Sequence, residues 1–144
     1  MKLEIEEIKK LIPHRDPFLF LDSCTIIEIG ISGEGFRKFT EDEFFFKGHF
    51  PKKPIVPGVV LIEALAQTAG VVVSKKFENT PNISVLFMSI QKSKFRKPVY
   101  PNDEINLKVS ILNKVKDVYK FSGVAFKNDV KVCEAEFSAM IYQD

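Results

Sequence analysis

The chain has 144 residues, of which 45% are hydrophobic and 28% charged, and its formal net charge is +2. This length predicts one domain over residues 1–144, large enough to bury a core. The near-average composition excludes disordered and low-complexity proteins, and 21 basic against 19 acidic residues give no indication of nucleic-acid binding. Cys24 and Cys133 are too few and too far apart for a disulfide framework or a zinc site, so we expect two free, buried thiols.

Residues 1–12 carry apolar side chains near helical spacing, with glutamates and lysines between them. This pattern predicts an amphipathic helix that ends before Pro13. The segment lacks the apolar core of a signal peptide, so we expect a cytoplasmic protein.

After Pro13 the periodicity changes from helical to β-type. The β-type stretches are residues 18–29, 33–40, 83–91, 105–111 and 133–141. In the last two, apolar and polar residues alternate, which predicts antiparallel strands with one buried and one solvated face. Asn128 and Asp129, between the final two strands, are typical of a hairpin turn.

Residues 55–73 read IVPGVVLIEALAQTAGVVV and are apolar on almost every side. Pro57 suits the first turn of a helix, and Lys75 and Lys76 suit its carbonyl end. Such a helix either spans a membrane or lies at the centre of a protein. Because Pro, Gly, Glu and Gln interrupt a stretch barely long enough to span, we expect no membrane span. The sequence therefore predicts an α+β protein with one long central helix wrapped by an antiparallel sheet.

Glu63 is the acidic residue of this apolar helix. An unpaired carboxylate is costly there, so Glu63 is expected to meet a polar partner or to keep its proton, as a general acid does. Gln67 lies one turn further along the same face. The alternative is a structural glutamate hydrogen-bonded to a neighbouring strand or to a partner subunit.

His49 lies in KGHFPKKPIVPG, where Pro51, Pro54 and Pro57 stiffen the loop leading into the helix. A stiff loop around one of only two histidines indicates an imidazole held in place, and imidazole accepts protons at neutral pH. The alternative is a purely structural histidine.

Gly58 stands at the expected start of the helix, where free backbone N–H groups and the helix dipole favour negative charge. A glycine lets a ligand approach the backbone closely, as an oxyanion hole requires. The sequence contains no nucleophile elbow, Walker loop or dinucleotide fingerprint, so proton-transfer chemistry is the class that remains.

Three blocks together resemble a known family: IPHRDPFLFLD (12–22), HFPKKPIVPGVVLIEALAQTAG (49–70) and KFRKPVYPND (94–103). They are similar to the β-hydroxyacyl-acyl carrier protein dehydratases of bacterial type II fatty acid synthesis, of the FabZ type. The resemblance implies the hot-dog fold, with a curved antiparallel sheet around the central helix. It also implies a homodimer with two active sites at the subunit interface, commonly assembled further as a trimer of dimers.

The resemblance also implies roles for individual residues. His49 would remove the proton α to the thioester carbonyl, and Glu63 would protonate or activate the departing β-hydroxyl. The Gly58 N–H would polarise the carbonyl, Gln67 would orient Glu63, and the Phe50 backbone would help to hold the histidine loop. The products would be a trans-2-enoyl thioester and water, with no metal or redox cofactor. In a dimer, His49 and Glu63 would meet from opposite subunits.

The partner implied by the resemblance is an acyl carrier protein that bears the acyl chain on a phosphopantetheine arm. The basic residues expected to dock this acidic protein, or else to form an ordinary solvated face, are Lys92, Lys94, Arg96 and Lys97. Tyr100 is expected to line or gate the entrance. His14 and Arg15 are expected to play a structural part in the loop before the first strand.

Two residues depart from the family pattern: Lys52 stands where glycine is frequent and Val56 where methionine is frequent. Both lie outside the implied chemistry and bear on chain-length preference. Related dehydratase–isomerases carry Asp at the position of Glu63, so glutamate favours dehydration without isomerisation. Two other functions stay open: a hot-dog thioesterase, in which Glu63 would activate water, and a non-catalytic acyl-binding module.

Overall fold

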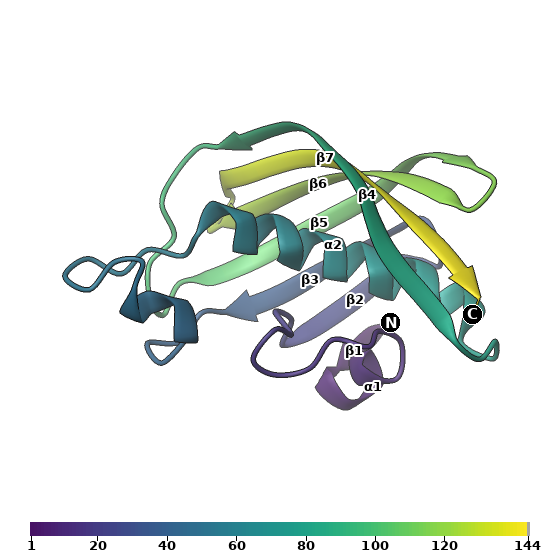
Figure 1. Ribbon diagram of the computed structural model, residues 1–144, viewed down its shortest axis with the longest axis horizontal. Helices are drawn as coiled ribbons and strands as arrows, with labels where there is room; N and C mark the ends of the chain where they lie inside the picture. Colours follow the sequence, from purple (N-terminus) through teal and green to yellow (C-terminus); the bar gives the residue numbers. More distant parts are fainter. Residues whose placement is uncertain (144) are drawn as a thin grey trace.

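The computed structural model describes residues 1–143 as a 7-stranded antiparallel sheet wrapped around one long helix (Figure 1). The strands, in the spatial order β1-β2-β3-β5-β6-β7-β4, are β1 (Lys2–Glu4), β2 (Ser23–Glu28), β3 (Ser32–Lys38), β4 (Ile83–Phe95), β5 (Glu104–Val115), β6 (Val118–Lys127) and β7 (Val130–Gln143). The helices are α1 (Ile5–Lys9), α2 (Gly58–Ser74) and the short 3-10 helices η1 (Phe44–Lys47) and η2 (Lys75–Phe77). The predicted architecture is confirmed.

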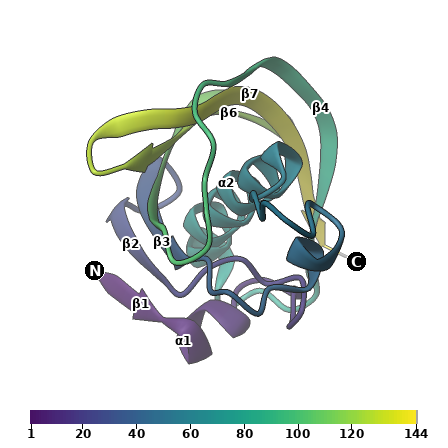
Figure 2. The same ribbon diagram turned by 90° about the vertical axis from the view of Figure 1, so that its left-hand side faces the viewer.

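The central helix α2 begins directly after Pro57, whose ψ of 134° is not helical. It therefore starts slightly later than the apolar run at residues 55–73. Seen from its end in Figure 2, α2 runs through the middle of the curved sheet. By length and composition the helical stretch Gly58–Phe77 could cross a membrane, but 72% of its most apolar window is buried inside the protein. Its apolar character is that of a core helix.

The hydrophobic core fills the space between α2 and the concave face of the sheet. The largest fully buried side chains include those of Phe20, Phe39, Phe121, Phe137 and Leu65. Aromatic side chains contribute large buried areas, so the core explains part of the phenylalanine content. Other phenylalanines are exposed, namely Phe18, Phe44, Phe50, Phe87 and Phe95.

The N-terminal segment differs from the helix predicted over residues 1–12. Its first residues form β1, which pairs Leu3 with Cys24 of β2, and α1 covers only Ile5–Lys9. Because β1 supplies backbone partners to an otherwise unpaired edge of β2, strand pairing overrides the local helical spacing. Leu3 and Ile8 are both buried, so the apolar spacing identified the inward side chains correctly.

The other predicted strands are present with shifted ends. Residues 18–22 precede β2 and do not belong to it, and β4 extends to Phe95. Asn128 and Asp129 both adopt positive φ, 48° and 64°, in the tight turn between β6 and β7. The left-handed backbone at both positions is what a two-residue hairpin turn requires, and Asn and Asp tolerate it.

Strand β4 forms one edge of the sheet. Within residues 1–143 it pairs with β7 and with no other strand. Large apolar side chains along it are exposed, namely those of Leu86, Phe87, Met88, Ile90 and Phe95. An unpaired apolar edge of this length offers a surface for pairing with another chain.

Candidate active site

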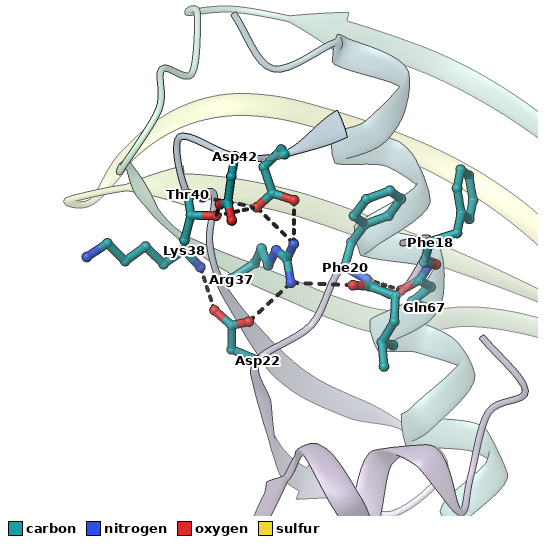
Figure 3. A network of polar contacts seen from close by, with 10 residues as sticks. Phe18, Phe20, Asp22, Arg37, Lys38, Thr40, Asp42 and Gln67 are labelled. Carbon is teal, nitrogen blue, oxygen red and sulfur yellow. Dashed lines mark hydrogen bonds and ion pairs between the residues drawn. The ribbon is translucent and has the colours of Figure 1, made fainter. Parts of the chain in front are cut away.

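Glu63 projects from α2 and is held by its neighbour on the same face. The Gln67 Nε2 amide donates to Glu63 Oε2 over 2.9 Å and to the Phe18 carbonyl over 3.0 Å. Gln67 Oε1 accepts the backbone N–H of Phe20 over 2.8 Å. Figure 3 shows Gln67 between α2 and the Phe18–Phe20 segment. Because the two backbone groups fix which end of the amide is the donor, Gln67 presents an N–H to the Glu63 carboxyl.

His14 lies against the same carboxyl group, with its Nε2 3.5 Å from Glu63 Oε2. Burial lowers the pKa of His14 below 6.5, Glu63 opposes this shift, and Arg15 adds to it. The ring is therefore mainly neutral at pH 7. The sequence led us to expect a structural role for His14 in its loop, and the structure places the ring beside the candidate acid. The signal that could have found it was its rarity, since the chain has only two histidines.

Glu63, His14 and Gln67 form the polar part of a narrow cavity of about 40 Å³. The remaining lining comes from Ile12, which precedes β2, and from apolar residues of α2, β4, β6 and β7, among them Gly70 and Phe87. This combination of a few convergent polar groups with apolar walls is typical of a small-molecule site.

His49 follows η1, and its imidazole is oriented by its own loop. Its Nδ1 lies 2.9 Å from the carbonyl of Ile55, so Nδ1 carries the proton and Nε2 is left as an acceptor. The Ile55 N–H donates back to the His49 carbonyl over 3.0 Å, and Phe50 and Lys53 exchange two backbone hydrogen bonds. The Phe50 ring stacks on the imidazole with 4.2 Å between ring centroids.

A second cavity of about 420 Å³ lies beside His49 and the first turn of α2. Gly58 lines it, and a Cβ at this position would lie 2.5 Å from carbons of the Phe95 ring. Only glycine therefore fits here without a shift of Phe95. In the first turn of α2 the Val60 N–H already donates to the Pro57 carbonyl over 2.9 Å, whereas the Gly58 N–H has no backbone partner within residues 1–143 and is available for a hydrogen bond at this cavity.

The structure does not bring His49 and Glu63 together within one chain. They line separate cavities, and the two cavities have no lining residue in common. Tyr100 lines neither of them and is partly exposed.

The basic run divides into two parts. Arg96 and Lys97 line the His49 cavity, whereas Lys92 and Lys94 line a different surface hollow on β4. Arg96 donates to Glu134 over 2.9 Å, and this hydrogen bond lowers the pKa of the Glu134 carboxyl.

Two carboxylates of β7 neutralise part of the positive charge of these basic residues. Glu134 pairs with Arg96, and Glu136 lies 3.4 Å from Lys92 Nζ. Among the described residues 1–143, no group of three His, Cys, Asp or Glu side chains is placed to hold a metal ion.

Comparison with known proteins first defines the class. The family model of the FabA-like domain matches residues 12–136. The dehydratase heterocomplex ApeI:P from Xenorhabdus doucetiae has the same fold, with a TM-score of 0.76 at 13% identity over 95% of this chain and 91% of that chain. A hypothetical thioesterase from Streptococcus pneumoniae also shares it, with a TM-score of 0.61 at 12% identity over 84% of this chain and 87% of that chain. The hot-dog fold is thereby confirmed.

The sequence relatives define the family more closely. A 3-hydroxyacyl-[acyl-carrier-protein] dehydratase FabZ of Gluconobacter oxydans is 45% identical over 96% of this chain and 83% of the relative. The FabZ protein of Campylobacter fetus is 40% identical over 96% of this chain and 97% of the relative. The chain therefore belongs to the FabZ family of 3-hydroxyacyl-[acyl-carrier-protein] dehydratases, hydro-lyases of fatty acid synthesis, and the resemblance seen in its motifs is confirmed.

Proposed function

We propose that His49 and Glu63 carry out the dehydration in this chain, as base and acid respectively. The observation that carries the assignment is the orientation of both groups. Gln67 holds the Glu63 carboxyl, and the Ile55 carbonyl leaves Nε2 of His49 free to accept a proton. General acid–base catalysis needs such a pair on either side of the reacting carbons.

In the proposed step, His49 Nε2 takes the proton from C2 of the 3-hydroxyacyl thioester. The electron pair of that C–H bond forms the C2=C3 double bond as the C3–O bond breaks. Glu63 delivers its proton to the departing hydroxyl group, which leaves as water. The Gly58 N–H at the N-terminal end of α2 stabilises the enolate-like charge on the thioester oxygen. A later proton transfer from His49 to Glu63 restores both groups.

We further propose that the complete site forms between two copies of this chain. Phe87 lines the Glu63 cavity and Phe95 lines the His49 cavity, and both are exposed on the free edge of β4. In a two-fold antiparallel pairing of β4 with β4, the Phe87 end of one strand faces the Phe95 end of the other. The acid of one copy then faces the base of the other.

A β4 variant tests this arrangement. Ile90→Lys places a charge on the exposed apolar edge and is expected to give a monomer without activity in a mass measurement in solution. Ile27→Lys, on β2, is a matched control because Ile27 is also exposed. A dimer with full activity in the Ile90 variant would contradict the two-chain site. The resemblance alone supports a trimer of dimers as the larger assembly, which the same mass measurement tests.

The proposed substrate carrier is an acyl carrier protein, as the names of the relatives state for those proteins. Its phosphopantetheine arm would enter beside Arg96 and Lys97 at the His49 cavity, where a cationic rim attracts an acidic partner. A cytoplasmic location follows from the same proposal.

The deciding experiment follows the enoyl thioester absorbance while the protein equilibrates with 3-hydroxyacyl-carrier substrate. His49→Ala and Glu63→Gln are each expected to lower the rate by about 10²–10⁴-fold. Release of free thiol is measured in parallel, because a thioesterase would produce it and a dehydratase would not. Binding without either reaction would instead identify an acyl-binding module.

A further inference from the structure

Beyond the narrow cavity at Glu63 lies a third cavity, which is polar, has a volume of about 340 Å³ and is distinct from the His49 cavity. Ile12 lines both the Glu63 cavity and this polar cavity. The two cavities follow one another along α2, since Gly70 lines the first and Ser74, one turn later, lines the second. They also follow one another along β4, where Val85 lines the first and Ile83 the second. Ile12 thus lies between the Glu63 cavity and the polar cavity, which follow one another along α2.

Ile12 closes the first compartment tightly. Its side chain is buried, with 2% exposed, and its Cγ2 lies 3.4 Å from the position that a Cβ on Gly70 would occupy. Beyond it the walls change character. Ser74 Oγ is buried without a hydrogen-bond partner within residues 1–143, and Lys9 and Lys10 line the same cavity. An alkyl end that stops at Ile12 stays among apolar side chains, whereas one that passes it meets polar groups.

The length of the Glu63 cavity can be estimated from the rise of α2. At a rise of about 1.5 Å per residue, Glu63 and Gly70 are about 10 Å apart along α2. An extended chain advances about 1.2 Å per bond, so this distance along α2 corresponds to about eight carbon–carbon bonds between the level of Glu63 and that of Ile12. Since Glu63 acts at C3 in the proposed function, an acyl chain of about a dozen carbons in total would reach from the thioester to Ile12.

We propose that Ile12 is the floor of the acyl tunnel and sets the longest chain that this enzyme dehydrates efficiently. This inference rests on the proposed function. Removal of the Ile12 side chain joins the Glu63 cavity to the polar cavity. A methyl group added at Gly70 narrows the Glu63 cavity on the side of Ile12 that faces Glu63. The two substitutions therefore shift chain-length preference in opposite directions.

The test compares kcat/KM for sixteen-carbon and eight-carbon 3-hydroxyacyl groups on the same carrier protein. Ile12→Ala is expected to raise the ratio of the long to the short substrate by about tenfold or more, because the space vacated by the Ile12 side chain beside Gly70 admits further methylenes, and each methylene in an apolar pocket has an effect of that size. Gly70→Ala is expected to lower the ratio by a similar factor. A ratio within each variant cancels any general loss of active protein.

Two features make the result decisive. Ile8→Ala is the matched control, because Ile8 is an equally buried isoleucine one turn earlier that lines neither cavity, and its ratio is expected to equal that of the wild type. Gly70→Ala replaces a helical glycine by a better helix former, so it remains informative if Ile12→Ala does not fold. An unchanged ratio in active Gly70→Ala or Ile12→Ala protein would overturn the tunnel floor. Wild-type protein without dehydration at any chain length would instead contradict the proposed function.

Discussion

Gln67 donates to Glu63 from one helical turn away, over 2.9 Å, and the same amide is fixed by the backbone of Phe18 and Phe20. The carboxyl group is therefore oriented by a side chain that is itself 1% exposed and cannot rotate without breaking buried hydrogen bonds. Catalytic groups lose effectiveness when such supporting contacts are absent.

Gln67→Met is expected to lower both activity and stability. The variant keeps the volume of the side chain but leaves the buried Phe20 N–H unsatisfied, at a cost of about 1–3 kcal/mol, and it removes the partner of the part-buried Phe18 carbonyl. Urea unfolding measures the stability loss, and the enoyl thioester assay measures kcat.

Thr68→Val is the matched control for this variant. The Thr68 hydroxyl is buried and donates to the Ala64 carbonyl over 2.8 Å, which is a local helix contact. We expect a smaller stability change and wild-type kcat. If Gln67→Met also retained wild-type kcat, Gln67 would have no part in positioning Glu63.

The pKa of His14 gives a pH-dependent prediction. Burial lowers this pKa from 6.5, and the opposing effect of Glu63 does not cancel it. Below about pH 6.5 the unfolded chain therefore binds a proton at His14 more readily than the folded chain does. The contribution of His14 to the free energy of unfolding is constant above that pH and falls as the solution is acidified.

An NMR titration of the two histidine rings measures this directly, and urea unfolding at about pH 7.5 and pH 5.5 measures its consequence. In His14→Gln the loss of stability on acidification is expected to be smaller than in the wild type. A His14 ring that titrates at or above pH 6.5 would contradict the burial argument.

The elements with strong local signals were predicted well. Apolar residues on every side of α2 indicated a core helix, and strict alternation indicated β5 and β7, because those patterns follow directly from burial. The segment at residues 1–12 failed because its helical spacing competes with strand pairing at the edge of β2, which is a contact between distant parts of the chain.

The candidate site divides in the same way. Glu63 and Gln67 could be recognised together because they lie one turn apart on one helix. The position of His14 against Glu63 depends on how residues 12–18 pass across α2, and no local pattern encodes that path. The separation of His49 from Glu63 into two cavities was equally invisible to spacing, and only the family resemblance linked them across a dimer.

The two cysteines are expected to be unreactive in the folded protein. Burial raises the pKa of Cys24 to about 12 and that of Cys133 to about 11, and nearby Glu34 and Glu134 add to the respective shifts. Because the thiolate is the reactive form, neither residue offers a nucleophile near neutral pH.

A thiol-reactive chromophore at about pH 8 measures this, with urea-unfolded protein as the reference for two accessible thiols. We expect the folded protein to react only as fast as it unfolds. Rapid labelling of either cysteine in the folded protein would show that its pKa or its burial differs from this structure.

Arg37 of β3 joins the two chain segments that support the site (Figure 3). Its Nη2 donates to both carboxylate oxygens of Glu43 over 2.8 and 2.9 Å, and its Nη1 donates to Asp22 over 3.2 Å. Glu43 immediately precedes η1 and the His49 loop, whereas Asp22 ends the segment that holds Gln67. The Arg37 guanidinium thus links the segment that holds Gln67, next to the proposed acid, to the segment that leads into the loop of the proposed base.

Arg37→Lys keeps the charge but has one donor nitrogen in place of two, so it cannot hold Glu43 and Asp22 from separate nitrogens. We expect a stability loss of about 2–3 kcal/mol, as for hydrogen bonds to a largely buried charged group. The side chains of Arg37 and Glu43 are only 16% and 9% exposed, so solvent does not replace the lost contacts. Arg96→Lys is the control, because Arg96 pairs with Glu134 in an exposed position where such exchanges change stability little. Urea unfolding of both variants decides the point: equal stabilities would mean that the Arg37 network contributes no more than a surface ion pair.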